Sequence, residues 1–138
     1  MFVDSPLIGE NVEELGVRFP DMSEIYDKKL QEILRQTAKE IGLDLKEGIY
    51  CQFKGPNYES PAEVRAAKIL GASAVGMSTG CEAIAANHMG MKVCGISCIT
   101  NLAAGMSKQK LDHKEVQETA DRVSRQFKQL VTEVIKTI

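Results

Sequence analysis

The sequence predicts a doubly wound α/β fold, in which helices cover both faces of a parallel sheet. Three short apolar runs, at residues 48–54, 73–76 and 91–99, suit buried parallel strands. Segments with helical periodicity or helix-start signals separate and follow these runs. The expected order from residue 48 is therefore strand, helix, strand, helix, strand, helix, with right-handed crossovers.

The chain before residue 48 divides into two expected parts. Residues 1–20 are expected to be irregular, as a surface excursion or the remainder of something upstream, because prolines and glycines interrupt them at Pro6, Gly9, Gly16 and Pro20. Residues 21–138 are expected to form the α/β part. Its first helix is expected from Asp21 to Leu43, where apolar residues recur at helical spacing, and Gly42 closes it.

Three later helices are predicted by their start signals. The helix expected at residues 60–71 begins with SPAE, which offers a capping hydroxyl, a proline at the first helical position and a glutamate three residues after the cap. The helix expected at residues 79–90 begins with TGCE, which repeats this pattern. A long helix at residues 112–138 begins with DHKE.

Composition excludes several classes of function. The chain has 138 residues, 43% hydrophobic and 26% charged residues and a formal net charge of -2, which is typical of a globular domain. No run of lysine and arginine stands out, so nucleic acid and anionic membrane are not expected partners. No apolar stretch approaches the length of a membrane span, and the N-terminus lacks a signal-peptide pattern, so a cytoplasmic protein is expected.

The cysteines and histidines do not predict a metal site. Four cysteines fit no zinc or redox spacing and are expected to be free buried thiols in a reducing compartment: Cys51, Cys81, Cys94 and Cys98. The two histidines form no His-x-x-x-His pair, so no metal and no cofactor are expected. His88, late in a helix, is expected to be a surface or capping residue, whereas His113, at a helix start, is a candidate for ligand contact.

Ligands of open parallel sheets bind beyond the carboxyl ends of the strands. That rule selects residues 55–60, 76–79 and 99–101, which should converge on one edge. They offer an aromatic ring, a carboxylate, a thioether, hydroxyls and a carboxamide, a set that suits a flat neutral heterocycle attached to a sugar. They offer no arginine or lysine, so a phosphate there would meet only the Ser78 hydroxyl and helix amides.

Several of these residues also have a purely structural explanation. Ser60 and Thr79 are accounted for as helix caps, and Met77 as core filling. Glu59 and Asn101 are harder to explain in this way, because a carboxylate and an amide facing a crevice need polar partners that apolar packing cannot supply.

At these strand ends the sequence resembles the trimeric, low-molecular-mass purine nucleoside phosphorylases. Residues 55–101, GPNYESPAEVRAAKILGASAVGMSTGCEAIAANHMGMKVCGISCITN, are similar throughout to that family, and PLIGEN with GVRFPDMSEIYD looks like its preceding stretch. The resemblance covers nearly the whole chain, and three strand-end motifs agree in order and separation. It implies the three-layer doubly wound sheet of that family, here lacking the N-terminal half that carries most of the phosphate site.

The resemblance also implies a role for each matching residue. Glu59 would accept a hydrogen bond from the purine N1-H, and Asn101 would bond N7 and the 6-oxo group, which makes them the catalytic pair. Tyr58, where many members carry phenylalanine, would pack against the purine ring. The remaining binding residues would be Met77 along the ribose, Ser78 at the phosphate, Thr100 beside the base, His113 at the 5'-hydroxyl and Phe19, inserted over the ribose of a neighbouring subunit.

The implied activity is phosphorolysis of inosine- and guanosine-type ribo- and deoxyribonucleosides in purine salvage, by a homotrimer that uses inorganic phosphate and no cofactor. The chain alone is expected to be weakly active or inactive. One alternative is a non-catalytic fragment that binds purine or self-associates. Another is a relative of methylthioadenosine phosphorylases, which generally carry a small hydroxyl residue in place of Glu59 and an aspartate in place of Asn101; this sequence has neither change.

Two positions depart from the family pattern. Gly80-Cys81-Glu82 replaces the more usual Val-Pro-Glu, and the loop between Asn101 and His113 is shorter than in mammalian members. The second departure bears on the role implied for His113.

Overall fold

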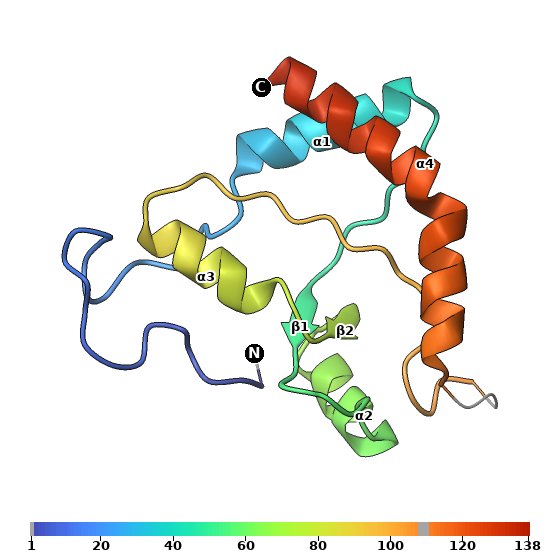
Figure 1. The fold of residues 1–138 in the computed structure, drawn as a ribbon, viewed down its shortest axis with the longest axis horizontal. Coiled ribbons are helices and arrows are strands. Elements are labelled where there is room, and N and C mark those ends of the chain that lie inside the picture. The colour runs from blue at the N-terminus through green and yellow to red at the C-terminus, as the bar shows by residue number, and fades with distance from the viewer. Residues whose placement is uncertain (1, 108–110) are drawn as a thin grey trace.

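The computed structural model describes residues 2–107 and 111–138 and contains two parallel strands and four helices within them (Figure 1). The elements run in the order α1 (Lys28–Glu40), β1 (Tyr50–Gln52), α2 (Pro61–Ile69), β2 (Ala74–Gly76), α3 (Gly80–His88) and α4 (His113–Thr137). The predicted α/β class is confirmed: the chain forms part of a parallel sheet together with the helices that pack around it.

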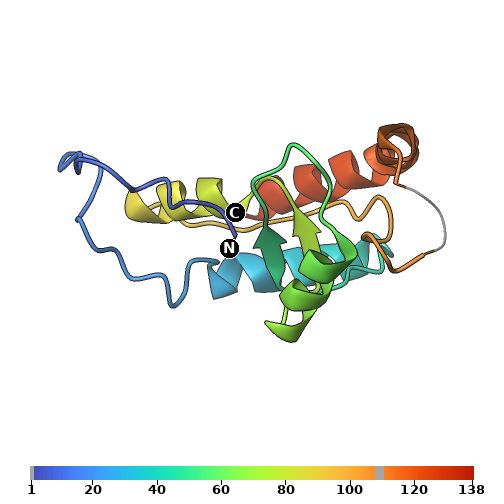
Figure 2. The same ribbon diagram turned by 90° about the horizontal axis from the view of Figure 1, so that it is seen from below.

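The two strands form a short parallel ladder in which Cys51 lies opposite Val75. Parallel pairing of strands joined through a helix is the arrangement that the β-α-β order predicts. At the other edge of β1, Phe2 forms an isolated parallel bridge with Phe53, and its backbone N-H donates to the carbonyl of Gln52 at 2.7 Å. The start of the chain therefore lies beside β1, as both views show (Figures 1 and 2).

The third predicted strand, at residues 91–99, is wrong for the described structure. This segment runs as extended chain across the molecule, without a strand partner (Figure 1). Its Val93 carbonyl accepts from the backbone of Asp27 at 2.8 Å, and Cys94 and Ile96 pack against the core between α1 and α4. An apolar run predicts burial, but a strand also needs a neighbour that completes its hydrogen bonds.

Helix α1 is shorter at its start than the predicted helix. The Asp21 carboxylate accepts hydrogen bonds from the backbone and hydroxyl of Ser23, a local turn that competes with helix formation. The helix begins after Asp27, whose carboxylate accepts from the Leu30 N-H at 2.9 Å. Its predicted end is confirmed, because Gly42 follows the helix with a φ of 70° and donates to the Lys39 carbonyl.

The start of α2 confirms its predicted capping box. The Ser60 hydroxyl accepts from the Glu63 N-H at 3.3 Å, and the Glu63 carboxylate accepts from the Ser60 N-H at 2.7 Å. Two exposed amides of the first turn are thereby satisfied. This cap fixes the chain directly after Glu59.

The capping box predicts an acid-sensitive contribution to stability. Hydrogen bonds from the Ser60 backbone N-H and hydroxyl lower the pKa of Glu63. A lowered folded pKa stabilises the protein above the unfolded value, and this contribution is lost as pH falls through the folded pKa. We expect Glu63→Gln to lower the urea-derived free energy of unfolding at pH 7 and to leave it near wild type at pH 3. The exposed control Glu14→Gln should show neither effect; equal losses at both pH values would contradict the assignment.

The larger core lies between α1 and α4, which pack side by side (Figures 1 and 2). Leu34 and Ala38 of α1 meet Leu130 of α4. Asp112 caps α4 as predicted, because its carboxylate accepts from the Lys114 N-H at 3.0 Å. A second small core, of Cys51, Phe53 and Ala67, joins β1 to α2.

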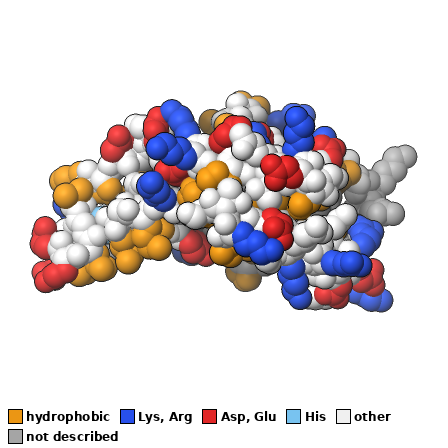
Figure 3. Space-filling view, turned by 90° about the horizontal axis from the view of Figure 1, so that it is seen from above, with side chains coloured by type: hydrophobic (Ala, Val, Ile, Leu, Met, Phe, Trp, Pro, Cys, Tyr) orange, Lys and Arg blue, Asp and Glu red, His pale blue; other side chains and the backbone are white. Residues whose placement is uncertain are grey.

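The N-terminal segment contains no helix or strand between residues 3 and 20. Arg18 closes it into a loop by donating to the carbonyls of Leu7 and Gly9 at 3.0 and 2.9 Å. Gly16 lies so close to the His88 carbonyl that a side chain would clash with it. Hydrophobic side chains gather at this end of the molecule (Figure 3), and the exposed ones are Ile8, Val12, Leu15, Val17 and Phe19.

His88 is buried at the end of α3, so its predicted surface position is wrong. Its Nε2 has no hydrogen-bond partner within the described ranges. All four cysteines are free as predicted, but only Cys51 is buried; Cys81 and Cys94 are half-buried, and Cys98 is exposed. Burial raises the pKa of the half-buried Cys94 thiol. None of the helices described is long and apolar enough to cross a membrane.

Candidate functional site

The loops that follow β1 and β2 lie against each other. Gly55 has a φ of 64°, and a Cβ atom built there would lie 2.5 Å from the Met77 Sδ. Only glycine combines this backbone conformation with so close an approach. Two of the three predicted ligand-binding segments are therefore in contact.

Glu59 is the main polar feature of the first loop. Its side chain is buried, with 8% of its surface exposed, and its Oε1 has no hydrogen-bond partner in the described structure. A buried carboxylate oxygen without a donor is costly to the folded state. Such a group is therefore suited to receive a hydrogen bond from a ligand.

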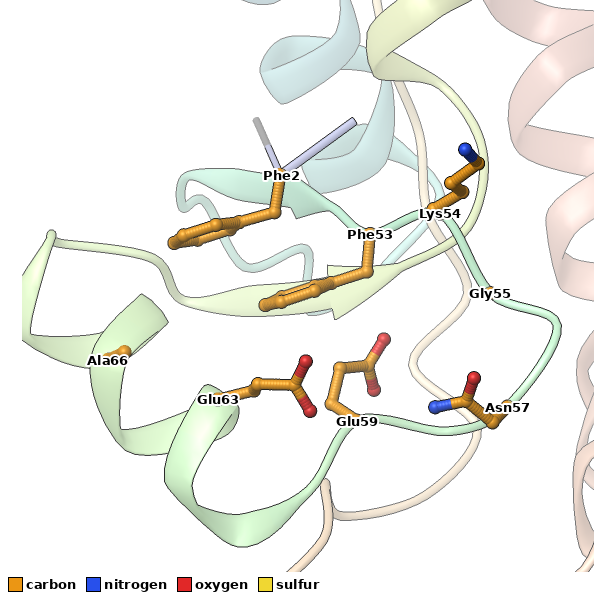
Figure 4. Close-up of a pocket in the computed structure, with 8 residues that line it drawn as sticks. All are labelled: Phe2, Phe53, Lys54, Gly55, Asn57, Glu59, Glu63 and Ala66. Carbon is orange, nitrogen blue, oxygen red and sulfur yellow. The ribbon is translucent and has the colours of Figure 1, made fainter. Parts of the chain in front are cut away.

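Glu59 lines a cavity of about 350 Å³ beside β1 and α2 (Figure 4). In the close-up the carboxylate of Glu59 lies below the ring of Phe53, between the side chains of Glu63 and Asn57. The other lining residues are Phe2, Lys54, Gly55 and Ala66. Within the chain described, no group of three or more acidic, histidine or cysteine side chains could hold a metal ion.

One wall of this cavity is aromatic. The rings of Phe2 and Phe53 are stacked, with centroids 4.7 Å apart and planes inclined by 12°. Phe2 comes from the start of the chain and Phe53 from the end of β1, so the wall depends on the bridge between these segments. A flat apolar surface beside an acceptor fits a flat heterocycle that carries an N-H.

The loop after β2 forms a tight turn at Thr79. This residue has φ 79° and ψ -50°, and the Gly80 N-H donates to the Ser78 carbonyl at 2.9 Å, which defines a γ-turn of the rare positive-φ form. The predicted Thr79 side-chain cap of α3 is therefore wrong. Its hydroxyl instead bonds the Ser78 hydroxyl at 3.1 Å.

Gln52 takes the place of that cap, and sequence reasoning missed it. Its Oε1 accepts from the Cys81 N-H in the first turn of α3 at 2.7 Å, and its Nε2 donates to the Met77 carbonyl at 3.4 Å. The side chain is buried. A glutamine inside the apolar run of a predicted buried strand was the available signal, because such a group needs polar partners.

The third predicted segment contains Thr100 and Asn101. The Thr100 hydroxyl donates to the Asn101 Oδ1 at 2.9 Å. This bond uses the oxygen of the Asn101 side chain, so its Nδ2 can donate to another group. A little further on, Gly105 packs against Pro61, where a Cβ atom would lie 2.8 Å from the proline Cβ. The chain that leaves Asn101 therefore returns to the start of α2, next to Glu59.

Of the predicted site residues, only Glu59 lines this cavity: Ser78, Thr100 and Asn101 do not, and neither do the remaining ones. Tyr58 and Met77 belong to the two loops in contact and are partly exposed. His113 is exposed at the start of α4, and part of the loop before it lies outside the described residues. Phe19 is 88% exposed, and the Arg18 guanidinium lies 5.8 Å from the centre of its ring. Phe2, Phe53 and Lys54 line the cavity and were not predicted, whereas Asn57 belongs to the predicted segment 55–60.

Comparison with known proteins gives consistent matches. A family model described as the phosphorylase superfamily matches residues 1–136. Purine nucleoside phosphorylase 1 of Geobacillus stearothermophilus is 49% identical over 134 residues, which cover 97% of this chain and 49% of that protein. The purine nucleoside phosphorylase of Bos taurus is 41% identical over 98% of this chain and 48% of its own length.

Solved structures agree. Crystal structures of Schistosoma mansoni purine nucleoside phosphorylase in complex with adenosine and with inosine each superpose with a TM-score of 0.91 at 34% identity, over 96% of this chain. This chain covers 49% of the first structure's chain and 48% of the second. The chain thus spans about half the length of the relatives it matches.

Proposed function

This chain belongs to the phosphorylase superfamily, and from that premise we propose that it forms part of a purine nucleoside phosphorylase that cleaves 6-oxopurine nucleosides. The reaction is a pentosyl transfer in which inorganic phosphate is the co-substrate. The observation that carries the proposal is the buried Glu59 carboxylate, whose Oε1 lacks a partner on the wall of a cavity beside stacked aromatic rings.

Glu59 would select the base. Hypoxanthine and guanine present a proton at N1, which a carboxylate accepts, whereas adenine presents a lone pair there. A carboxylate that faces a lone pair stays unpaired, and mismatches of this kind can be costly in rate. A Schistosoma relative has been crystallised with adenosine, so we expect discrimination in affinity and turnover rather than strict exclusion of adenosine.

Asn101 would stabilise the departing base. Phosphate attacks C1' of the ribose while the C1'-N9 bond breaks, so the ribose becomes cationic and the purine takes the bonding electron pair. An amide that donates to N7 meets this charge as it develops. Preorganised donors of this type contribute about 3 kcal/mol to transition-state stabilisation. The Thr100 hydroxyl supports the role, because it binds Oδ1 and leaves Nδ2 to donate.

The other roles follow from similarity to the phosphorylases. Tyr58 would pack on the base, Met77 would line the ribose and Ser78 would contact phosphate. Two residues would act at the edge of the site: His113 at the 5'-hydroxyl, and Phe19 across the interface of a homotrimer. The exposure of Phe19 on the loop closed by Arg18 supports a contact with a second subunit. The setting proposed is purine salvage in the cytoplasm.

A second candidate function is purine binding without catalysis, favoured by the cavity at Glu59, which offers a base both an acceptor and an aromatic wall. Two measurements on the full chain separate these functions. We expect calorimetric titration to show hypoxanthine binding more tightly than adenine, and the weak inosine conversion to hypoxanthine to require phosphate. Binding without any turnover would favour the second function. Preference for adenine would instead favour a methylthioadenosine phosphorylase, and binding of neither base would reject the Glu59 site.

A further inference from the structure

We infer that Gln52 is a positioning residue that holds the turn after β2 in the shape needed at the ribose side of the site. This inference rests on the proposed function, in which Met77 and Ser78 of that turn face ribose and phosphate. Gln52 itself lies in β1 and is not placed against any ligand. It acts through two hydrogen bonds to the neighbouring segment.

The two hydrogen bonds of Gln52 span the turn. One end of its side chain holds the Met77 carbonyl just before the turn, and the other holds the Cys81 N-H just after it. Gln52 itself is buried, with 7% of its surface exposed. Each partner would lose its hydrogen bond if the side chain were apolar.

The turn between these two anchors has an unfavourable backbone conformation. Thr79 has a positive φ, which is uncommon for a threonine and persists only where the surroundings enforce it. The Ser78 N-H donates to the Tyr50 hydroxyl at 3.3 Å, so β1 supplies a third contact. Gly76 gives this hydroxyl its space, because a Cβ there would clash with it.

Loss of the Gln52 contacts should therefore affect one half of the site more than the other. The turn would relax, and Met77 and Ser78 would move with it. Glu59 would keep its place, because the α2 capping box holds the adjacent Ser60. A nucleoside needs both halves of the proposed site, whereas a free base needs mainly the half that contains Glu59.

The test compares inosine with hypoxanthine by calorimetry on the full chain. We expect Gln52→Met, which keeps the side-chain length, to weaken inosine binding by about tenfold, as expected for the loss of hydrogen bonds. Hypoxanthine binding should change by no more than about twofold, because the half of the site that contains Glu59 does not depend on this turn. Gln31→Met is the matched control, because Gln31 also donates to a backbone carbonyl, that of Tyr26, but lies in α1.

A second variant separates positioning from packing. In Gln52→Glu the introduced carboxyl, when protonated, can donate to the Met77 carbonyl and accept from the Cys81 N-H, as the amide does. Burial should raise its pKa. We expect inosine affinity relative to hypoxanthine to be near wild type at pH 5.5 and to fall below that of the wild type, measured in parallel, by pH 8.

The outcomes distinguish the inference from the function on which it rests. Equal losses for inosine and hypoxanthine in Gln52→Met, or no loss for either, overturn the positioning role and leave the Glu59 site in place. Absence of binding by the wild-type chain overturns both. A loss specific to inosine, with recovery at low pH in Gln52→Glu, supports the assignment.

Discussion

Replacement of Glu59 by glutamine should lower hypoxanthine affinity by about tenfold or more, because a hydrogen bond to a charged acceptor exceeds a neutral one by roughly 1–2 kcal/mol. It should also remove most of the discrimination against adenine, since the introduced amide can donate to the adenine N1 lone pair. Calorimetric titration of the full chain with both bases measures these effects. In any assembly that turns over inosine, Glu59→Gln and Glu59→Ala should reduce that turnover severely.

Glu59→Gln should not destabilise the fold. In the wild type the Oε1 of Glu59 is buried without a partner, and removal of the charge relieves that cost. We expect the urea-derived free energy of unfolding to stay constant or to rise by about 1 kcal/mol. Glu10→Gln on the exposed N-terminal segment is the control and should change neither quantity. A large loss of stability together with unchanged base affinity would show that Glu59 is a structural residue.

Local signals in the sequence predicted the helix ends well. Ser60 and Asp112 carry side chains that bond amides within their own first turns, and Gly42 needs only its own backbone freedom to close α1. These interactions span a few residues, so sequence spacing is enough to predict them. The predicted start of α1 was wrong for a reason that is also local, because Asp21 forms a competing turn with Ser23.

Features that depend on distant neighbours were not predictable in the same way. The run at residues 91–99 is apolar enough for a strand but has no strand beside it in the described structure, and its side chains pack on helices instead. Thr79 matched a capping pattern, but Gln52, far away in sequence, supplies the acceptor for α3. The backbone at Thr79 forms a γ-turn instead.

The candidate site shows the same division. Glu59 was predicted from its position just after a strand, because that position faces the ligand edge of a parallel sheet. The aromatic wall beside it was not, since Phe2 and Phe53 meet only through a bridge between the start of the chain and β1. The residue types that follow a strand predict the chemistry of a site. The residues that form the walls of its cavity depend on contacts between segments distant in sequence, which the sequence pattern does not reveal.

Replacement of Leu130 by alanine should cause the largest loss of stability. Leu130 is 1% exposed and forms the α4 side of the core with Leu34 and Ala38. Deletion of a buried leucine side chain costs about 2–5 kcal/mol, a large share of the roughly 5–15 kcal/mol that stabilises a typical domain. Urea unfolding followed by circular dichroism should therefore show a much lower midpoint of unfolding. The variant should keep its helicity without urea if the wild-type free energy of unfolding exceeds the free energy lost with the side chain.

The matched control is Ile135→Ala on the same helix, because Ile135 is 67% exposed and its truncation should cost less than about 1 kcal/mol. Cys94 and Ile96 pack against the core that contains Leu130, and the chain leads from them to Asn101. The Leu130 cavity should therefore also loosen the segment that carries the proposed N7 donor, measured as faster chemical labelling of the half-buried Cys94 thiol. Equal effects of Leu130→Ala and Ile135→Ala would mean that α4 is not anchored through this core.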